Sequence, residues 1–281
     1  MSSPLKILKK YGIQPTRSLG QSFLIDNNIT AKIVDSAGIE KSDTVVEIGA
    51  GPGMMTRRIA DKAGHVIALE IDSRIVEVLR HELGTRPNVH IIETDVLDFD
   101  FSTVAGDEDR IKVIGNIPYN ISSQILFRLI EYRHVLSSVT LMFQREVAER
   151  IMALPGSKEY GILSVMTVMY MLPSKVTTVP ASCFYPKPRV ESMVLTMDVR
   201  ERPLCEACDY DIFRKVVRSA FAKRRKTLIN SMKESPFIRD LDIDLTSILG
   251  GLGINPTRRG ETLAVEEFAQ LSRAIEASIS H

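Results

Sequence analysis

A glycine-rich run, EIGAGPG at residues 47–53, follows a short β-branched apolar segment and precedes a helical pattern. Alternating glycines allow a sharp turn between a strand and a helix and let a ligand approach the backbone closely. Glu70 ends the next apolar segment, 21 residues after Gly49. An acid at this place in a strand–helix–strand unit can reach the two hydroxyls of a ribose. The pair predicts a nucleoside-binding α/β unit, although the glycine run alone is also typical of an ordinary strand–helix turn.

The rest of the chain follows the same alternation of strands and helices. Short apolar runs predict strands at residues 44–48, 66–69, 89–92, 111–114 and 139–143, and periodic patterns predict helices at 54–63, 73–83, 122–132 and 145–153. Strands that are apolar throughout are buried on both faces, which favours a parallel sheet with helices on both sides. Ser73 is the expected N-cap of the second of these helices.

The remaining patterns predict how the first unit closes and where a second begins. A buried helix is expected at residues 160–172, and two closing strands are expected within 175–199. Residues 201–208 resemble a linker, and the patterns beyond them are helical. We therefore expect a domain at 1–200 and a helical domain at 201–281.

The glycine run discriminates between cofactors. Its G-x-G-x-G spacing with an internal Pro fits the nicotinamide fingerprint G-x-G-x-x-G poorly, and it lacks the Lys-Ser/Thr of a P-loop. S-adenosyl-L-methionine carries no phosphate; it needs glycines beside its amino-acid part, an acid on its ribose and a polar group near its adenine. Asp95, just after the third strand, can accept from the adenine amino group, although alone it would indicate only a surface turn. The residues favour S-adenosyl-L-methionine.

Asn116-Ile117-Pro118-Tyr119 ends the fourth predicted strand, at the sheet edge where ligands of open α/β sheets bind. The exocyclic amine of a base is a poor nucleophile because its lone pair is delocalised into the ring. The side-chain oxygen of Asn116 and the carbonyl of Ile117 can accept its two N–H bonds and free that lone pair. Pro118 fixes the direction of that carbonyl, and Tyr119 offers a face for a flipped base. These four residues predict an amino-methyltransferase site, against the alternative of a simple strand-ending turn.

Charge is balanced over the whole chain but not locally. Lys plus Arg number 36 and Asp plus Glu 35, so the formal net charge is +1 and a uniformly basic nucleic-acid coat is excluded. Residues 214–226 hold seven basic residues and no acid. This run favours RNA phosphates over a merely solvated helix face. The expected RNA-binding residues are Arg218, Lys223, Arg224, Arg225 and Lys226, with a basic N-terminal arm formed by Lys6, Lys9, Lys10 and Arg17.

The cysteines and the apolar segments exclude other classes. Cys205 and Cys208 form a single C-x-x-C, which is half of a zinc site without a second pair, so no metal is expected. No segment reaches the roughly 18 apolar residues needed to span a bilayer. The N-terminus shows no export signal. We expect a cytoplasmic protein.

The motifs resemble those of the small-subunit (16S) ribosomal RNA adenine N6,N6-dimethyltransferase family. The resemblance covers nearly the whole chain. Besides the glycine run, Glu70, Asp95 and the tetrapeptide, it includes an entry motif at residues 19–24, FYPKPRVES at 184–192, a basic segment at 221–228 and a closing motif at 258–268. Ser22 stands where the entry motif of the family usually has Asn. The resemblance implies a Rossmann-like class I S-adenosylmethionine methyltransferase sheet with helices on both faces and a small all-helical C-terminal domain.

The resemblance also implies the reaction and the site residues. The substrate would be two adjacent adenines in the hairpin loop near the 3′ end of 16S rRNA, in the immature 30S subunit, acted on by a monomer without metal or membrane. The expected cofactor-binding residues are Ser22, Leu24, Gly49, Gly51, Glu70, Asp95 and Asn116. Phe184 would form a second wall against the flipped adenine, opposite Tyr119, with a core phenylalanine as the alternative.

Two other functions stay open at the level of sequence. One is a 23S rRNA adenine methyltransferase of the macrolide-resistance type, against which the long C-terminal domain argues. The other is a ribosome-assembly factor whose binding role outweighs its catalysis.

Overall fold

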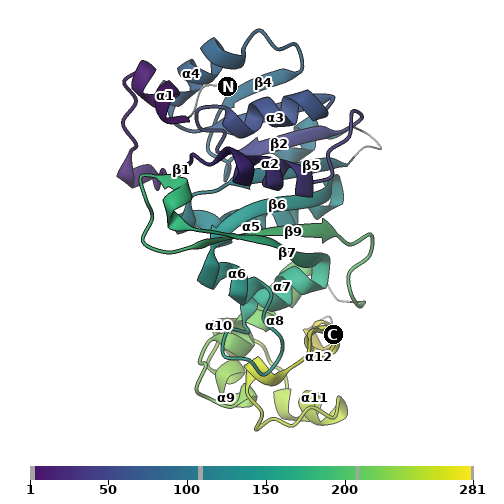
Figure 1. Ribbon diagram of the computed structural model, residues 1–281. Coiled ribbons are helices and arrows are strands. Elements are labelled where there is room, and N and C mark those ends of the chain that lie inside the picture. The colour runs from purple at the N-terminus through teal and green to yellow at the C-terminus, as the bar shows by residue number, and fades with distance from the viewer. Residues whose placement is uncertain (1–3, 107–109, 207–208, 280–281) are drawn as a thin grey trace. The chain divides into compact units, whose positions relative to one another are not determined.

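The computed structural model describes residues 4–106, 110–206 and 209–279, and its backbone divides into two compact units (Figure 1). Unit 1 comprises residues 1–148 and 173–199, and unit 2 comprises residues 149–172 and 200–281. The segment 149–172 thus groups with the C-terminal helices. The second part of unit 2 begins at residue 200, beside the domain boundary expected from the sequence.

The strands are β1 (Phe23–Leu24), β2 (Thr44–Ile48), β3 (His65–Glu70), β4 (Val89–Glu93), β5 (Ile111–Asn116), β6 (Leu136–Gln144), β7 (Met171–Val179), β8 (Phe184–Tyr185) and β9 (Ser192–Val199). The α-helices are α1 (Pro4–Lys10), α2 (Asn27–Ser36), α3 (Met54–Lys62), α4 (Ser73–Leu83), α5 (Ser122–Glu131), α6 (Arg145–Ile151), α7 (Ile162–Tyr170), α8 (Tyr210–Phe221), α9 (Leu228–Lys233), α10 (Pro236–Arg239), α11 (Leu245–Gly251) and α12 (Val265–Ile279).

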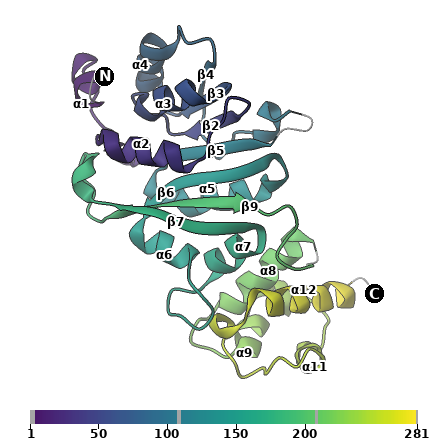
Figure 2. The ribbon, with the colours of Figure 1, turned by 45° about the vertical axis from the view of Figure 1, so that its right-hand side comes forward.

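Seven strands form one mixed sheet in the order β4-β3-β2-β5-β6-β9-β7, and all seven are labelled in Figure 2. The first five of these strands run parallel, and β9 pairs antiparallel with β6. The predicted α/β fold with a parallel sheet and closing strands is confirmed. A separate two-stranded ribbon joins β1 to β8, pairing Phe23 with Tyr185.

The strand order creates the place for a site. The chain runs outward from β2 through β3 to β4, then returns to β5 on the other side of β2. Ligands of open α/β sheets bind where the order reverses, beyond the carboxyl ends of the strands. The glycine run follows β2 and the Asn116 tetrapeptide ends β5, so both motifs reach this point.

Helix α4 occupies the predicted residues, but its N-cap differs from the prediction. The predicted N-cap, Ser73, is wrong: Asp72 is the cap, in an extended conformation, and its carboxylate accepts from the Arg74 amide. Asp and Ser are equally good caps. The choice is decided by a hydrogen-bond network around Asp72, which is described below.

Unit 2 is helical from residue 200 onward within its described residues, as predicted, and Figure 2 shows its helices α8, α9, α11 and α12. Helix α8 buries Phe213, Val216 and Val217. The closing helix α12 buries Phe268 and Leu271, and the Phe268 ring lies 5.8 Å from that of Phe221. These apolar faces form the core of the unit. Within the described residues, no helix combines the length and the apolar character that crossing a membrane requires.

Candidate active site

A cavity of about 220 Å³ opens at the switch point of the sheet. Eight of the predicted site residues line it: Ser22, Gly49, Glu70, Asp95, Asn116, Ile117, Pro118 and Tyr119. The wall opposite the strand ends is the N-terminal segment, residues 18–23. Among the described residues that line this cavity there is no Lys or Arg. The sequence motifs therefore come together in one acidic, cation-free pocket.

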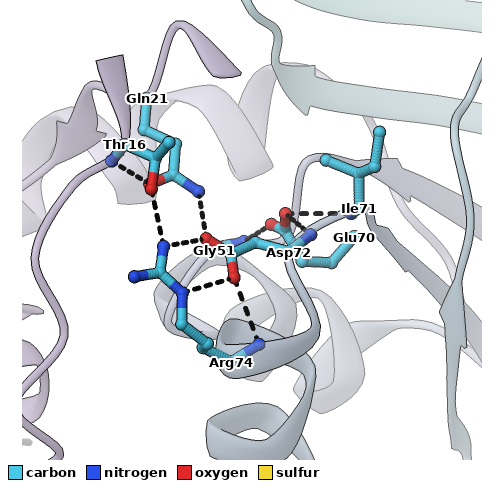
Figure 3. A network of polar contacts seen from close by, with 7 residues as sticks. All are labelled: Thr16, Gln21, Gly51, Glu70, Ile71, Asp72 and Arg74. Carbon is cyan, nitrogen blue, oxygen red and sulfur yellow. Dashed lines mark hydrogen bonds and ion pairs between the residues drawn. The ribbon is translucent and has the colours of Figure 1, made fainter. Parts of the chain in front are cut away.

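Glu70 ends β3 with its carboxylate held by the backbone, as Figure 3 shows. Oε1 accepts from the amides of Ile71 and Asp72, both at 3.0 Å, and Oε2 accepts from the Gly51 amide at 2.9 Å. Burial raises the pKa of the Glu70 carboxyl above its usual value, and the three N–H groups oppose that rise. Since each carboxylate oxygen can accept about two hydrogen bonds, Oε2 keeps capacity for a hydroxyl.

Two glycines of the run are required by the geometry. Gly49 and Gly51 have φ of +69° and +55°, in the left-handed region that side chains rarely adopt. A Cβ on Gly51 would lie 3.2 Å from the Phe23 ring, and one on Gly49 would lie 3.3 Å from the Asn116 carbonyl. Gly51 lines a smaller neighbouring cavity of about 30 Å³. Its amide donates the hydrogen bond to Glu70 Oε2.

The other predicted cofactor residues occupy three different settings. Asp95 is half-buried and accepts from the Leu97 amide at 2.9 Å through Oδ1. Ser22 donates its hydroxyl to the Pro186 carbonyl at 2.9 Å. Leu24 is 8% exposed and borders the smaller cavity, not the larger one.

Asn116 is oriented by its own amide. Nδ2 donates to the backbone carbonyl of Ser22 at 2.9 Å. Because this contact occupies the nitrogen, Oδ1 is the amide atom that remains able to accept a hydrogen bond, and the residue lines the pocket. The Asn116 amide is therefore held in the rotation in which its oxygen, and not its nitrogen, is free to accept a hydrogen bond from an N–H group.

The next three residues complete the neutral side of the pocket. Ile117 has a buried side chain, and Pro118 holds an extended backbone with φ −60° and ψ 130°. The Tyr119 hydroxyl lies 2.5 Å from Ser192 Oγ, and burial raises the pKa of the phenol. Tyr119 is thus tethered at its hydroxyl while its residue lines the cavity.

Phe184 does not join this group. It is 3% exposed and packs in the apolar core with Phe23, Leu24 and Val194. Its strand β8 pairs with β1, and this pairing turns alternate side chains to opposite faces. The ring therefore lies in the apolar core, and its expected role as a second wall against the flipped adenine stays a prediction.

Sequence reasoning overlooked Glu47 as a site residue. Its side chain, on β2 below the glycine run, is wholly buried and borders the smaller cavity. No hydrogen bond of good geometry reaches either carboxylate oxygen within the described residues, although the side chain and backbone of Thr56 lie close enough to favour the charged form. Burial raises the pKa of Glu47 to about 8. An acid placed in a buried apolar strand was the signal that could have identified it.

The predicted RNA-binding residues all lie on the surface of unit 2. Arg218 is exposed on α8, and residues 223–226 form an exposed turn between α8 and α9. Part of their charge is paired: Arg224 contacts Glu261 at 3.1 Å, and Lys226 contacts Glu234. Arg218, Lys223 and Arg225 have no ion-pair partner among the described residues. In the N-terminal arm, Lys10 pairs with Glu82 at 2.8 Å.

The described residues contain no cluster of His, Cys, Asp or Glu able to hold a metal ion. Cys205 has a free thiol, and Cys208, the other half of the C-x-x-C, lies outside the described residues.

The pocket fits a positively charged nucleoside. A carboxylate with a free acceptor position faces it, glycine backbone lines it, and the absence of cations among the described lining residues disfavours a pyrophosphate. With this strand order, these features define an S-adenosylmethionine-dependent methyltransferase. The family model described as ribosomal RNA adenine dimethylase matches residues 13–271. The chain belongs to this family and is an rRNA adenine N6,N6-dimethyltransferase.

Individual relatives agree with the family. The chain is 46% identical to ribosomal RNA small subunit methyltransferase A of Shouchella clausii (strain KSM-K16), over 97% of this chain and 94% of the relative. Its fold is similar to the crystal structure of a dimethyladenosine transferase from Plasmodium falciparum, with a TM-score of 0.76, 27% identity, and coverage of 90% and 97%. It is also similar to the 23S rRNA methyltransferase ErmE, with a TM-score of 0.66, 25% identity, and coverage of 90% and 99%.

Proposed function

We propose that this enzyme transfers methyl groups from S-adenosylmethionine to the N6 amines of two adjacent adenines in the hairpin loop near the 3′ end of 16S rRNA, during 30S subunit biogenesis. The observation that carries the proposal is the orientation of Asn116. Its amide nitrogen is occupied by the Ser22 carbonyl, so its oxygen is available to an amine donor. Adenine N6 presents such a donor when the base is flipped into a pocket.

The donor would bind on the acidic side of the pocket. Glu70 would accept from a ribose hydroxyl through Oε2, and Asp95 would accept from the adenine amine through the oxygen that the Leu97 amide leaves open. Gly49 and Gly51 would allow the amino-acid part to approach the backbone. Ser22 would contribute its backbone and Leu24 an apolar boundary.

Bound S-adenosylmethionine supplies a methyl group already activated on a sulfonium. The chain therefore needs no strong base and contributes mainly position and orientation. Asn116 Oδ1 and the Ile117 carbonyl would accept the two N–H bonds of the target amine and draw its nitrogen toward tetrahedral geometry. Pro118 holds that carbonyl in place, and Tyr119 would stack on the adenine ring.

Selection of RNA would come from the exposed cations. Arg218, Lys223 and Arg225 have charges that no acid compensates within the described residues, so they would contact phosphates most strongly. Arg224 and Lys226 are paired with Glu261 and Glu234, and these ion pairs would have to break before the two side chains could bind phosphate. In this scheme residues 1–200 carry the transfer and residues 201–281 bind RNA, in a cytoplasmic monomer.

The main alternative is methylation of 23S rRNA, which the likeness to ErmE keeps in view. The similarity to a small-subunit enzyme at 46% identity over 97% of the chain favours 16S rRNA. The second alternative is a role in ribosome assembly that outweighs catalysis. The hydrogen bond that orients the Asn116 amide supports a catalytic role instead, because binding alone would not require this orientation.

The test uses immature 30S particles from cells lacking this enzyme, incubated with it and the donor. Mass spectrometry of the rRNA should show two adjacent N6,N6-dimethyladenines near the 3′ end of 16S rRNA. Asn116→Ala, assayed in parallel, should produce neither. Modification of 23S rRNA instead would overturn the substrate. Full rescue of assembly in cells by the inactive, folded Asn116→Ala variant would give the binding role precedence.

A further inference from the structure

A second carboxylate lies two residues after Glu70 and points the other way, toward the N-terminal segment. Asp72 is 6% exposed and caps α4. In Figure 3, Glu70 and Asp72 leave one turn in different directions, with Gln21 and Thr16 facing Asp72. The proposed donor-binding role of Glu70 does not use this second acid.

Both oxygens of the Asp72 carboxylate accept hydrogen bonds from Arg74, in the first turn of the helix that Asp72 caps. Arg74 donates to Oδ1 from its amide at 3.1 Å and from Nε at 2.9 Å, and Nη2 donates to Oδ2 at 2.5 Å. The Arg74 guanidinium holds the pKa of Asp72 down to about 2. Asp72 therefore remains a carboxylate at any physiological pH.

The same carboxylate also grips the N-terminal segment. Gln21 Nε2 donates to Asp72 Oδ2 at 2.9 Å, across 51 positions of the chain. Gln21 Oε1 accepts from the Thr16 amide at 2.7 Å, and Arg74 Nη2 donates to the Thr16 hydroxyl at 2.6 Å. Gln21 is thus bound on both sides, and both ends of residues 16–21 are tied to the Asp72–Arg74 pair.

This segment is the wall of the donor pocket. Residues 18–23 line the cavity, and Asn116 holds the far end of that stretch through the Ser22 carbonyl. The near end has no such strand contact, since β1 begins only at Phe23. The Gln21–Asp72 contact therefore determines where the first half of the wall lies relative to Glu70.

We propose that Asp72 is a positioning residue for the methyl donor: through Gln21 and Thr16 it fastens the N-terminal wall of the pocket to the turn that carries Glu70. Because Asp72 also gives its amide to Glu70 Oε1, one turn sets both the ribose acceptor and the wall opposite it. This inference rests on the proposed donor position at Glu70. In this proposal Asp72 holds Gln21, and Gln21 holds the N-terminal wall of the pocket. Neither residue contacts the reacting atoms.

The test variant is Asp72→Asn. Asparagine is an equal N-cap, so Oδ1 still accepts from the Arg74 amide and α4 is kept. Its Nδ2 would instead face the donors of Gln21 and Arg74, and the tie would be lost. Since hydrogen bonds to charged groups are strong, calorimetry with S-adenosylhomocysteine should show the dissociation constant rising about tenfold.

Two further measurements and a control variant separate positioning from general damage. Hydrogen exchange at the amides of residues 16–22 should accelerate in free Asp72→Asn and slow again at saturating S-adenosylhomocysteine. Affinity for immature 30S particles should stay within twofold of wild type. Glu77→Gln is the matched control: it removes a carboxylate that pairs with an arginine on the same helix, 73% exposed at its side chain, and should change neither readout.

Two more variants keep the inference testable if Asp72→Asn folds poorly. Gln21→Ala leaves the cap untouched and should weaken S-adenosylhomocysteine binding about fivefold. Combining Asp72→Asn with Gln21→Glu reverses donor and acceptor across the contact and should restore part of the affinity. Affinity within twofold of wild type in both Asp72→Asn and Gln21→Ala, or a swap no better than Asp72→Asn, overturns the proposal.

Failure of this proposal can be distinguished from failure of the proposed donor site at Glu70. Glu70→Ala should abolish detectable S-adenosylhomocysteine binding if the donor lies at Glu70. Loss in Glu70→Ala with no change in the Asp72 and Gln21 variants would remove only the anchoring role. Unchanged binding in Glu70→Ala would remove the donor position itself.

Discussion

The two sides of the pocket are built from opposite chemistry. On the β3 side, Glu70 and Asp95 are acids whose positions are fixed by backbone amides. On the β5 side, Asn116, Ile117 and Tyr119 line the pocket, and none of their side chains carries a charge. The difference agrees with the roles proposed for the two sides: an acid can hold a cationic nucleoside, whereas neutral acceptors can hold an amine without protonating it.

We expect the largest effect from a substitution that changes only the neutral side of the pocket. Asn116→Ala removes one of the two acceptors proposed for the target amine, and loss of one such transition-state contact costs roughly 10²–10³ in rate. We expect kcat for adenine methylation to fall by about that factor, with affinity for immature 30S particles unchanged. Single-turnover kinetics on those particles measures it. A fall in RNA affinity at constant kcat would contradict the division between the two sides.

The next effect breaks the acidic side. Glu70→Gln removes the charge and directs an amide group at a backbone N–H donor, so the turn and the ribose contact are both weakened. The dissociation constant of S-adenosylhomocysteine should rise roughly tenfold to a hundredfold, while RNA affinity persists. Calorimetry measures the first and filter binding the second. Equal donor binding by wild type and variant would refute the role of Glu70.

The sequence predicted the parts of both sides that depend on local pattern. The strand over residues 44–48, the glycine run and the acid ending β3 follow from periodicity and from the few residues that tolerate φ above zero. Contacts between distant segments left no local signal. The Gln21–Asp72 contact and the pairing of β8 with β1, which buries Phe184, arise only when the chain has closed. For this reason the sequence could not show that Asp72, and not Ser73, caps α4, or that the Phe184 ring packs in the core.

A third prediction concerns the buried acid below the glycine run. The pKa of Glu47 is about 8 in the folded protein and about 4.5 when unfolded, so the folded state retains a proton that the unfolded state releases between these pH values. Stability conferred by the neutral acid is therefore complete below pH 4.5 and falls as pH rises toward 8.

Glu47→Gln does not titrate and should escape that loss. From pH 5 to pH 8, its free energy of unfolding should rise by at least about 2 kcal/mol relative to wild type, since each pH unit between the two pKa values can contribute up to about 1.4 kcal/mol. Urea unfolding at both pH values measures this. A difference independent of pH would show that Glu47 is ionised in the folded protein.

The smallest expected effect separates the ring of Tyr119 from its hydroxyl. Tyr119→Phe removes only the 2.5 Å contact with Ser192 and leaves the ring beside Asn116, so kcat on immature 30S particles should fall less than fivefold. Tyr119→Ala also removes the stacking face, worth roughly 1–3 kcal/mol per base, and should reduce activity by at least tenfold. If the two variants lost equal activity, the hydroxyl contact with Ser192 would be the important feature of Tyr119. The stacking of its ring on the adenine would then contribute nothing measurable.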